Sequence, residues 1–98
     1  MSLPPDILHK ISQKYSDDQQ AEVQLKLLDL KRFLESHSWV EIDRVLRGVI
    51  HLNSNLDKMD IFINLTRQDP RDLLLNAEYK LENGKDIQLH DFSKPFTD

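Results

Sequence analysis

The chain has 98 residues, with 13 basic and 17 acidic side chains and a formal net charge of −4. This length is typical of one domain, and the negative charge argues against nucleic acid as a partner. The chain has no cysteine, which excludes disulfides, thiolate zinc sites and thiol nucleophiles. No apolar run approaches the roughly 20 residues that a membrane span needs, so we expect a cytoplasmic protein without a membrane partner.

The N-terminal part of the chain predicts a pair of helices. The first begins at Pro4 and Pro5, because proline suits the first turn of a helix. Apolar residues at helical spacing follow it. The second helix runs from Ser16 to about Ser36, and Ser16 and Gln19 have the spacing of a capping box.

The second predicted helix carries two apolar stripes on nearly opposite sides. The first stripe consists of Val23, Leu27, Leu30 and Leu34. The second stripe consists of Ala21, Leu25 and Leu28. We favour a helix sandwiched between others in the core, because such helices are apolar on several sides. The alternative is a homodimer seam or a groove for another protein, with Ala21, Leu25 and Leu28 as the residues that contact the partner.

Three further helices are predicted near residues 39–52, 55–66 and 70–82. Ser38 and Glu41 have capping-box spacing before the first of them, and Ser54 with Asp57 repeats that spacing before the second. The third has the strongest start signal, because Asp69 can cap the helix and Pro70 occupies a position that needs no N–H group. Gly48 in the middle of a helix often marks close contact between helices, although a surface glycine is an equal explanation.

Asn83-Gly84 is compatible with a helix end or with a hairpin turn. A two-residue turn would place Leu81 opposite Asp86 and Lys80 opposite Ile87. That register mixes polar and apolar side chains on each face, which a half-buried hairpin avoids. We therefore prefer a helix that ends at Gly84, and the sequence leaves both readings open.

The combined elements predict an all-α fold, a compact bundle of about five helices with a C-terminal extended tail. The single domain, 1–98, comprises an N-terminal helical pair at 1–37, a three-helix segment at 38–82 and a tail at 83–98.

One group of polar residues is a candidate ligand site or ion-pair cluster. Its members lie on the predicted helices 39–52 and 70–82, and they are Arg44, Arg47, His51, Arg71, Asp72, Glu78 and Tyr79. We favour ordinary ion pairs within a helix, Asp43 with Arg47 and Glu41 with Arg44. The alternatives are an anionic ligand or acidic partner bound by the arginines, or a bridge from Arg44 or Arg47 to Asp72 or Glu78 that fixes helix register.

No pattern in the chain indicates catalysis, a cofactor or a metal. The four histidines lie on different segments without ligand spacing, and we interpret them as surface residues. Two glycines cannot form a phosphate-binding loop, and no serine lies in a nucleophile elbow. We expect no catalytic residues, no cofactor and no metal.

Three segments carry a resemblance to known sequences: Arg44-Val45-Leu46-Arg47, Asp69-Pro70-Arg71-Asp72 and Ala77-Glu78-Tyr79. With them the chain resembles a group of small bacterial hypothetical proteins over about half of its length. The resemblance implies a bacterial origin and brings no activity with it.

Two classes of function remain. We favour a small non-catalytic protein–protein interaction or regulatory module, whose partner is another protein or a second copy of the chain. The alternative is a binder of small anionic ligands, or a weak enzyme, that uses the Arg44, Arg47 and His51 strip.

Overall fold

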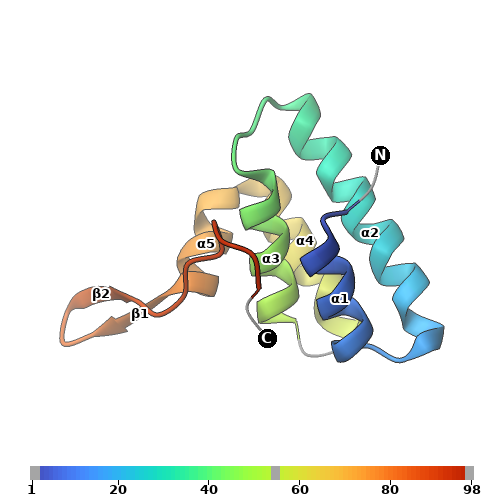
Figure 1. Cartoon of the computed structure of the whole chain (residues 1–98). Helices are drawn as coiled ribbons and strands as arrows, with labels where there is room; N and C mark the ends of the chain where they lie inside the picture. The colour runs from blue at the N-terminus through green and yellow to red at the C-terminus, as the bar shows by residue number, and fades with distance from the viewer. Residues whose placement is uncertain (1–2, 54–55, 97–98) are drawn as a thin grey trace.

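The computed structural model describes residues 3–53 and 56–96. Its elements are α1 (Pro5–Lys14), α2 (Asp17–Ser36), α3 (Ile42–Leu52), the 3₁₀ turn η1 (Leu56–Lys58), α4 (Met59–Gln68), α5 (Pro70–Glu78), β1 (Tyr79–Glu82) and β2 (Lys85–Gln88). The helices gather in one body, and the two strands form an arm that extends from it (Figure 1). Within the described ranges the five α-helices agree with the prediction, but the hairpin means that the fold is not purely all-α.

The core lies between α1, α2, α3, α4 and α5. Its buried members are Leu3, Ile7, Ile11, Tyr15, Val23, Leu27, Leu30, Leu34, Val45, Leu46, Val49, Ile50, Met59, Ile63 and Leu73. The apolar positions that recur every three or four residues in the sequence therefore face one another, as helical periodicity requires. No helix in the described part of the chain is both long and apolar enough to cross a membrane.

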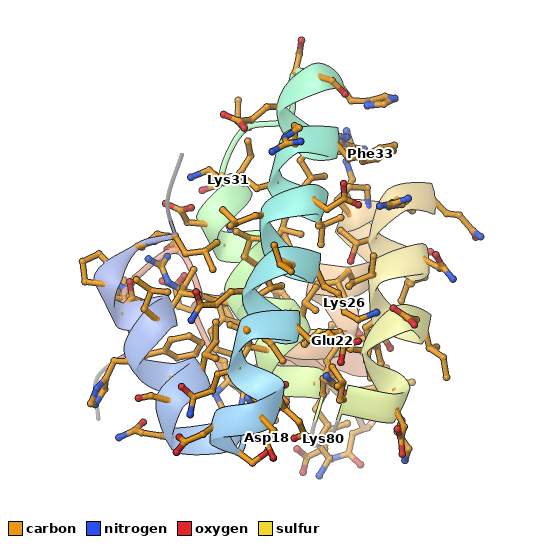
Figure 2. The ribbon with its side chains drawn as sticks, turned by 90° about the vertical axis from the view of Figure 1, so that its right-hand side faces the viewer. Asp18, Glu22, Lys26, Lys31, Phe33 and Lys80 are labelled. Carbon is orange, nitrogen blue, oxygen red and sulfur yellow. The ribbon has the colours of Figure 1, made fainter. Side chains whose placement is uncertain are left out.

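α2 and α4 run side by side in the same direction. Lys26 Nζ lies 2.7 Å from an Asp60 carboxylate oxygen, and seven residues further along α4 the Arg67 guanidinium lies 2.6 Å from Asp29. Figure 2 shows Lys26 and Phe33 on the side of α2 that faces α4, whereas Lys31 points to the other side. These ion pairs are exposed, so each contributes at most about 1 kcal/mol.

The predicted capping box at Ser38 and Glu41 is wrong. Ser38 is the left-handed residue that ends α2, with φ of 58°, and α3 begins only at Ile42. The Ser38 N–H donates to the Glu35 carbonyl and the Trp39 N–H to the Leu34 carbonyl, which is the hydrogen-bond pattern of a Schellman motif. The serine therefore satisfies the carbonyls of the preceding helix and caps no N–H group of the following one.

The start of α5 agrees with the sequence more closely than the start of α4. Asp69 caps α5 by accepting a hydrogen bond of 3.0 Å from the Arg71 N–H, and Pro70 is the first helical residue. α4 begins at Met59 after the turn η1, four residues later than predicted. Ser54, the predicted cap for that helix, lies outside the described residues.

α3 and α5 approach each other closely at Gly48. A Cβ atom at this position would lie 2.9 Å from Leu73 Cδ1 and 3.2 Å from Ala77 Cβ. Both distances are shorter than ordinary van der Waals contact between carbon atoms. The glycine therefore marks helix contact, and the surface explanation is excluded.

The preferred helix end at Gly84 is wrong, because residues 79–88 form the hairpin β1-β2. Asn83 and Gly84 have φ of 52° and 78°, the two positive values that a two-residue type I′ turn requires. The register pairs Leu81 with Asp86 and Lys80 with Ile87, which is the register that we rejected. Both strands are almost entirely exposed, so neither face has to be uniformly apolar. The segment 38–82 thus ends in a strand.

Candidate functional site

The Arg44 side chain forms an interhelical ion pair. Its Nε and one terminal nitrogen donate to the two carboxylate oxygens of Glu78, at 2.9 and 2.6 Å, and the other nitrogen lies 3.1 Å from Glu41. Glu78 is 1% exposed, and this buried partner raises the pKa of Arg44. The bridge from α3 to α5 and the Glu41–Arg44 pair both match sequence predictions.

Arg47 also forms an ion pair with a carboxylate on another helix, but the sequence analysis did not predict which carboxylate. Its guanidinium donates to both carboxylate oxygens of Asp6 on α1, at 2.8 and 3.2 Å, and to the Phe92 carbonyl at 3.0 Å. Burial opposes ionisation of Asp6, but Arg47 and the Phe96 N–H outweigh it and hold the pKa of Asp6 below its ordinary value. The predicted partner of Arg47 was Asp43, four residues earlier on the same helix, and the carboxylate that it binds instead is that of Asp6.

The two arginine pairs anchor the C-terminal tail. The Phe92 N–H donates to Glu78 at 2.8 Å and the Phe96 N–H to Asp6 at 3.1 Å. The returning tail is drawn in red beside α3 (Figure 1). Both guanidinium groups are therefore committed to carboxylates, which argues against the arginine strip as a ligand site.

The remaining members of the predicted cluster do not gather around these pairs. Asp72 is exposed, and the Arg71 guanidinium lies 5.9 Å from the centre of the Trp39 ring. Tyr79 is partly buried at the junction of α5 and β1. His51 lies at the end of α3, where its ring is 4.4 Å from that of His90 and 5.0 Å from that of Phe92.

His51 instead lines an open groove between α1, the end of α3 and residues 89–96. The groove has a volume of about 850 Å³. We call it the basic groove, because five of its lining residues are Lys10, Lys14, His51, His90 and Lys94. Burial, the neighbouring His90 and the two lysines of α1 lower the pKa of His51.

The second stripe of α2 is only partly exposed. Ala21 faces solvent and Leu25 is 68% exposed, whereas Leu28 packs against the core. The favoured prediction of a helix sandwiched in the core is therefore wrong at Ala21 and Leu25. The exposed part is a single large side chain on a charged helix, which is common on protein surfaces.

The hairpin is the other exposed apolar region. Leu81 is 70% and Ile87 42% exposed, and Leu89 follows directly after β2 with a similar exposure. β1 and β2 form a sheet of two strands. Each strand therefore has one edge that the partner strand leaves uncovered.

Two contacts of these sites were missed from the sequence, and the hairpin was weighed but not preferred. Asp6 and Phe92 lie 41 and 45 residues from Arg47, so no helical spacing relates them. The contact of His51 with His90 likewise joins distant segments. A signal did exist for the hairpin, because Asn-Gly between short apolar strands is a strong hairpin pattern.

Among the described residues, no group of three or more histidine, aspartate or glutamate side chains is placed to hold a metal ion. No protein-family model, curated protein or solved structure matches the chain, and nothing in these comparisons bears on the resemblance to small bacterial proteins.

Proposed function

We propose that this protein is a small non-catalytic interaction module, and that its contact element is the hairpin β1-β2. The observation that supports this proposal is the exposure of both faces and both edges of the arm. A lone two-stranded hairpin is at best marginally stable in water. A partner that pairs with it would supply the packing that the helical body does not.

The free edge of β1 offers backbone groups for strand addition. The Leu89 N–H donates to the Glu78 carbonyl at 2.7 Å, so Glu78 and Leu89 form a hydrogen-bonded pair at the base of the arm. Along an antiparallel ladder, hydrogen-bonded pairs of residues alternate with non-hydrogen-bonded pairs. The N–H and C=O groups of Leu81 therefore point away from β2, toward any strand that is added. The Tyr79 carbonyl points the same way, whereas the Tyr79 N–H donates to the Leu75 carbonyl at the end of α5.

The partner that this edge fits best is a second copy of β1. An antiparallel pair centred on Leu81 places the two leucines opposite each other, and it places Lys80 opposite Glu82 of the second copy on both sides. Opposite charges and apolar pairs across strands are favourable. A symmetric pair of two β2 strands has no equivalent register. Residues opposite each other in such a pair share one face of the sheet, whereas Lys85 and Asp86 lie on opposite faces of β2 and cannot form a charge pair across the two copies.

The proposed dimer is weak. Two four-residue edges make a contact well below about 1,200 Å², the range of transient complexes. We expect a dissociation constant on the order of 100 µM, or about −5.5 kcal/mol. Sedimentation velocity over a concentration series measures it.

Three variants separate the possible contacts. Leu81→Pro removes an outward N–H and leaves the bonds to β2 intact, because proline is tolerated at such edge positions. Asp86→Pro makes the same change on the opposite edge, and Leu25→Glu places a charge on the exposed side of α2. Only Leu81→Pro should abolish self-association, with circular dichroism verifying that each variant folds.

Other outcomes would contradict the proposal. A chain that stays monomeric to about 1 mM, where binding is worth only about −4.1 kcal/mol, excludes a second copy as the partner. Loss of the dimer in Asp86→Pro alone would assign the contact to β2. Loss in Leu25→Glu alone would assign it to α2.

A further inference from the structure

The basic groove has a charge opposite to that of the whole protein. Its lining includes three lysines, two histidines and one carboxylate, that of Asp91, whereas the chain carries a net charge of −4. Asp91 accepts hydrogen bonds from the Ser93 N–H and hydroxyl. Its charge is thus partly satisfied within its own turn.

The cations come from separate elements and converge on the groove. Lys14 Nζ donates to the Ile50 and His51 carbonyls at the end of α3, where it offsets the negative end of the helix dipole. Lys10 lies 5.0 Å from the centre of the Phe96 ring. Lys94 adds a third ammonium group from the tail. Positive charge therefore lies on both sides of the groove, on α1 and on the tail.

The groove also has an aromatic wall. The rings of His90 and Phe92 are stacked with centres 5.4 Å apart, and Phe96 meets Phe92 edge to face at 5.9 Å. The exposed Leu89 side chain extends this apolar surface. Flat apolar groups pack well on such rings, and a volume of about 850 Å³ is in the range of small-molecule sites.

We propose that the basic groove binds a small organic anion with a flat apolar body, such as an aromatic carboxylate. The carboxylate lies near Lys10 and Lys94, and the ring packs on the aromatic wall. The proposal is independent of the hairpin contact, because β1 and β2 contribute no residue to the groove. It also differs from the arginine-strip hypothesis, of which only His51 remains.

Titration of the protein with 1-naphthoate, followed by NMR and calorimetry, tests the proposal. We expect saturable binding, with shifts concentrated at His51, His90 and Phe92. The neutral analogue 1-naphthalenemethanol should bind at least about tenfold more weakly, which corresponds to about 1.4 kcal/mol. Inorganic phosphate lacks the flat body and should also bind at least about tenfold more weakly.

The matched variants are the double substitution Lys10→Gln with Lys94→Gln and the control Lys85→Gln on the hairpin. The double variant should lose at least about tenfold in naphthoate affinity, and the control should bind as the wild type does. Circular dichroism and the Phe92 amide signal verify that the tail stays in place. A loss of affinity in a variant with an intact tail then reports charge alone.

A pH series gives a second readout. His51 faces Lys10 and Lys14 on α1 and His90, Asp91 and Lys94 on the tail. Protonation of His51 adds positive charge beside a bound anion, so naphthoate affinity should rise as the pH falls from about 7.5 to about 5.5. In His51→Gln this rise should be smaller.

Four results would overturn the proposal. They are the absence of saturable binding, equal affinity for the neutral analogue, equal affinity for inorganic phosphate, and unchanged affinity in the double lysine variant. The second result indicates an apolar site, and the third indicates that the groove takes an ion only.

Discussion

The ion pair between Arg44 and Glu78 makes a sharp prediction about stability. Glu78→Gln preserves the shape of the side chain and removes its charge. The buried carboxylate accepts two hydrogen bonds from Arg44 and one from the Phe92 N–H. An amide has one acceptor oxygen, and its NH₂ group faces another donor in this position.

The magnitude follows from these contacts. Breaking a buried ion pair costs about 3–5 kcal/mol, and a hydrogen bond to a charged group contributes about 1.5–3 kcal/mol. Arg44 retains Glu41 and some solvent contact, so the expected loss is about 2–4 kcal/mol. That loss is a large share of the free energy of unfolding of a typical domain, which is about 5–15 kcal/mol.

Urea unfolding followed by circular dichroism and tryptophan fluorescence measures this loss. The matched control is Asp72→Asn, an exposed carboxylate on the same helix, which should cost less than about 1 kcal/mol. Amide exchange at Phe92 should become faster in Glu78→Gln only, because that N–H loses its acceptor. Equal stabilities of the two variants would refute the assignment of Glu78 as the anchor of the tail.

Three further predictions concern the core and the response to pH. Gly48→Ala should destabilise by up to about 2 kcal/mol in urea melts, because overpacking against Leu73 costs about 1–3 kcal/mol and the helix-propensity gain of about 1 kcal/mol offsets only part of it. Leu73→Ala and Leu46→Ala, both fully buried, should each cost about 2–5 kcal/mol, and a loss below about 1 kcal/mol at both would contradict the assigned helix faces. Because the pKa of Asp6 is lowered on folding, its contribution is present above its ordinary value of 3.8 and is lost as the pH falls through the folded value. The stability difference between wild type and Asp6→Asn should therefore shrink on acidification below about pH 4, and a difference independent of pH would refute the pairing with Arg47.

The polar residues that now matter most were partly foreseen. Arg44 with Glu78 appeared as a possible bridge, because both residues occupy polar positions, on the predicted helices 39–52 and 70–82. Arg47 with Asp6 did not, since a pair 41 residues apart leaves no local pattern. The basic groove combines α1, α3 and the tail, and only His51 had been singled out.

Local patterns in the amino-acid sequence are enough to predict where most helices lie and which side of each helix is buried. Val23, Leu27, Leu30 and Leu34 recur at helical spacing, and the Asp69-Pro70 start of α5 satisfies its own N–H groups locally. These features depend on neighbours within one or two turns.

Long-range contacts select between structures at positions where the local sequence is compatible with two of them. Ser38 ends one helix and starts none, because the backbone N–H groups of Ser38 and Trp39 donate to the last carbonyls of α2. Asn83-Gly84 is compatible with a helix end and with a hairpin turn. The tail, held by Glu78 and Asp6, leads the chain back to the body and leaves the arm in solvent, where a mixed hairpin is allowed. The physical reason is that long-range hydrogen bonds and burial outweigh local propensities of at most about 1 kcal/mol per residue.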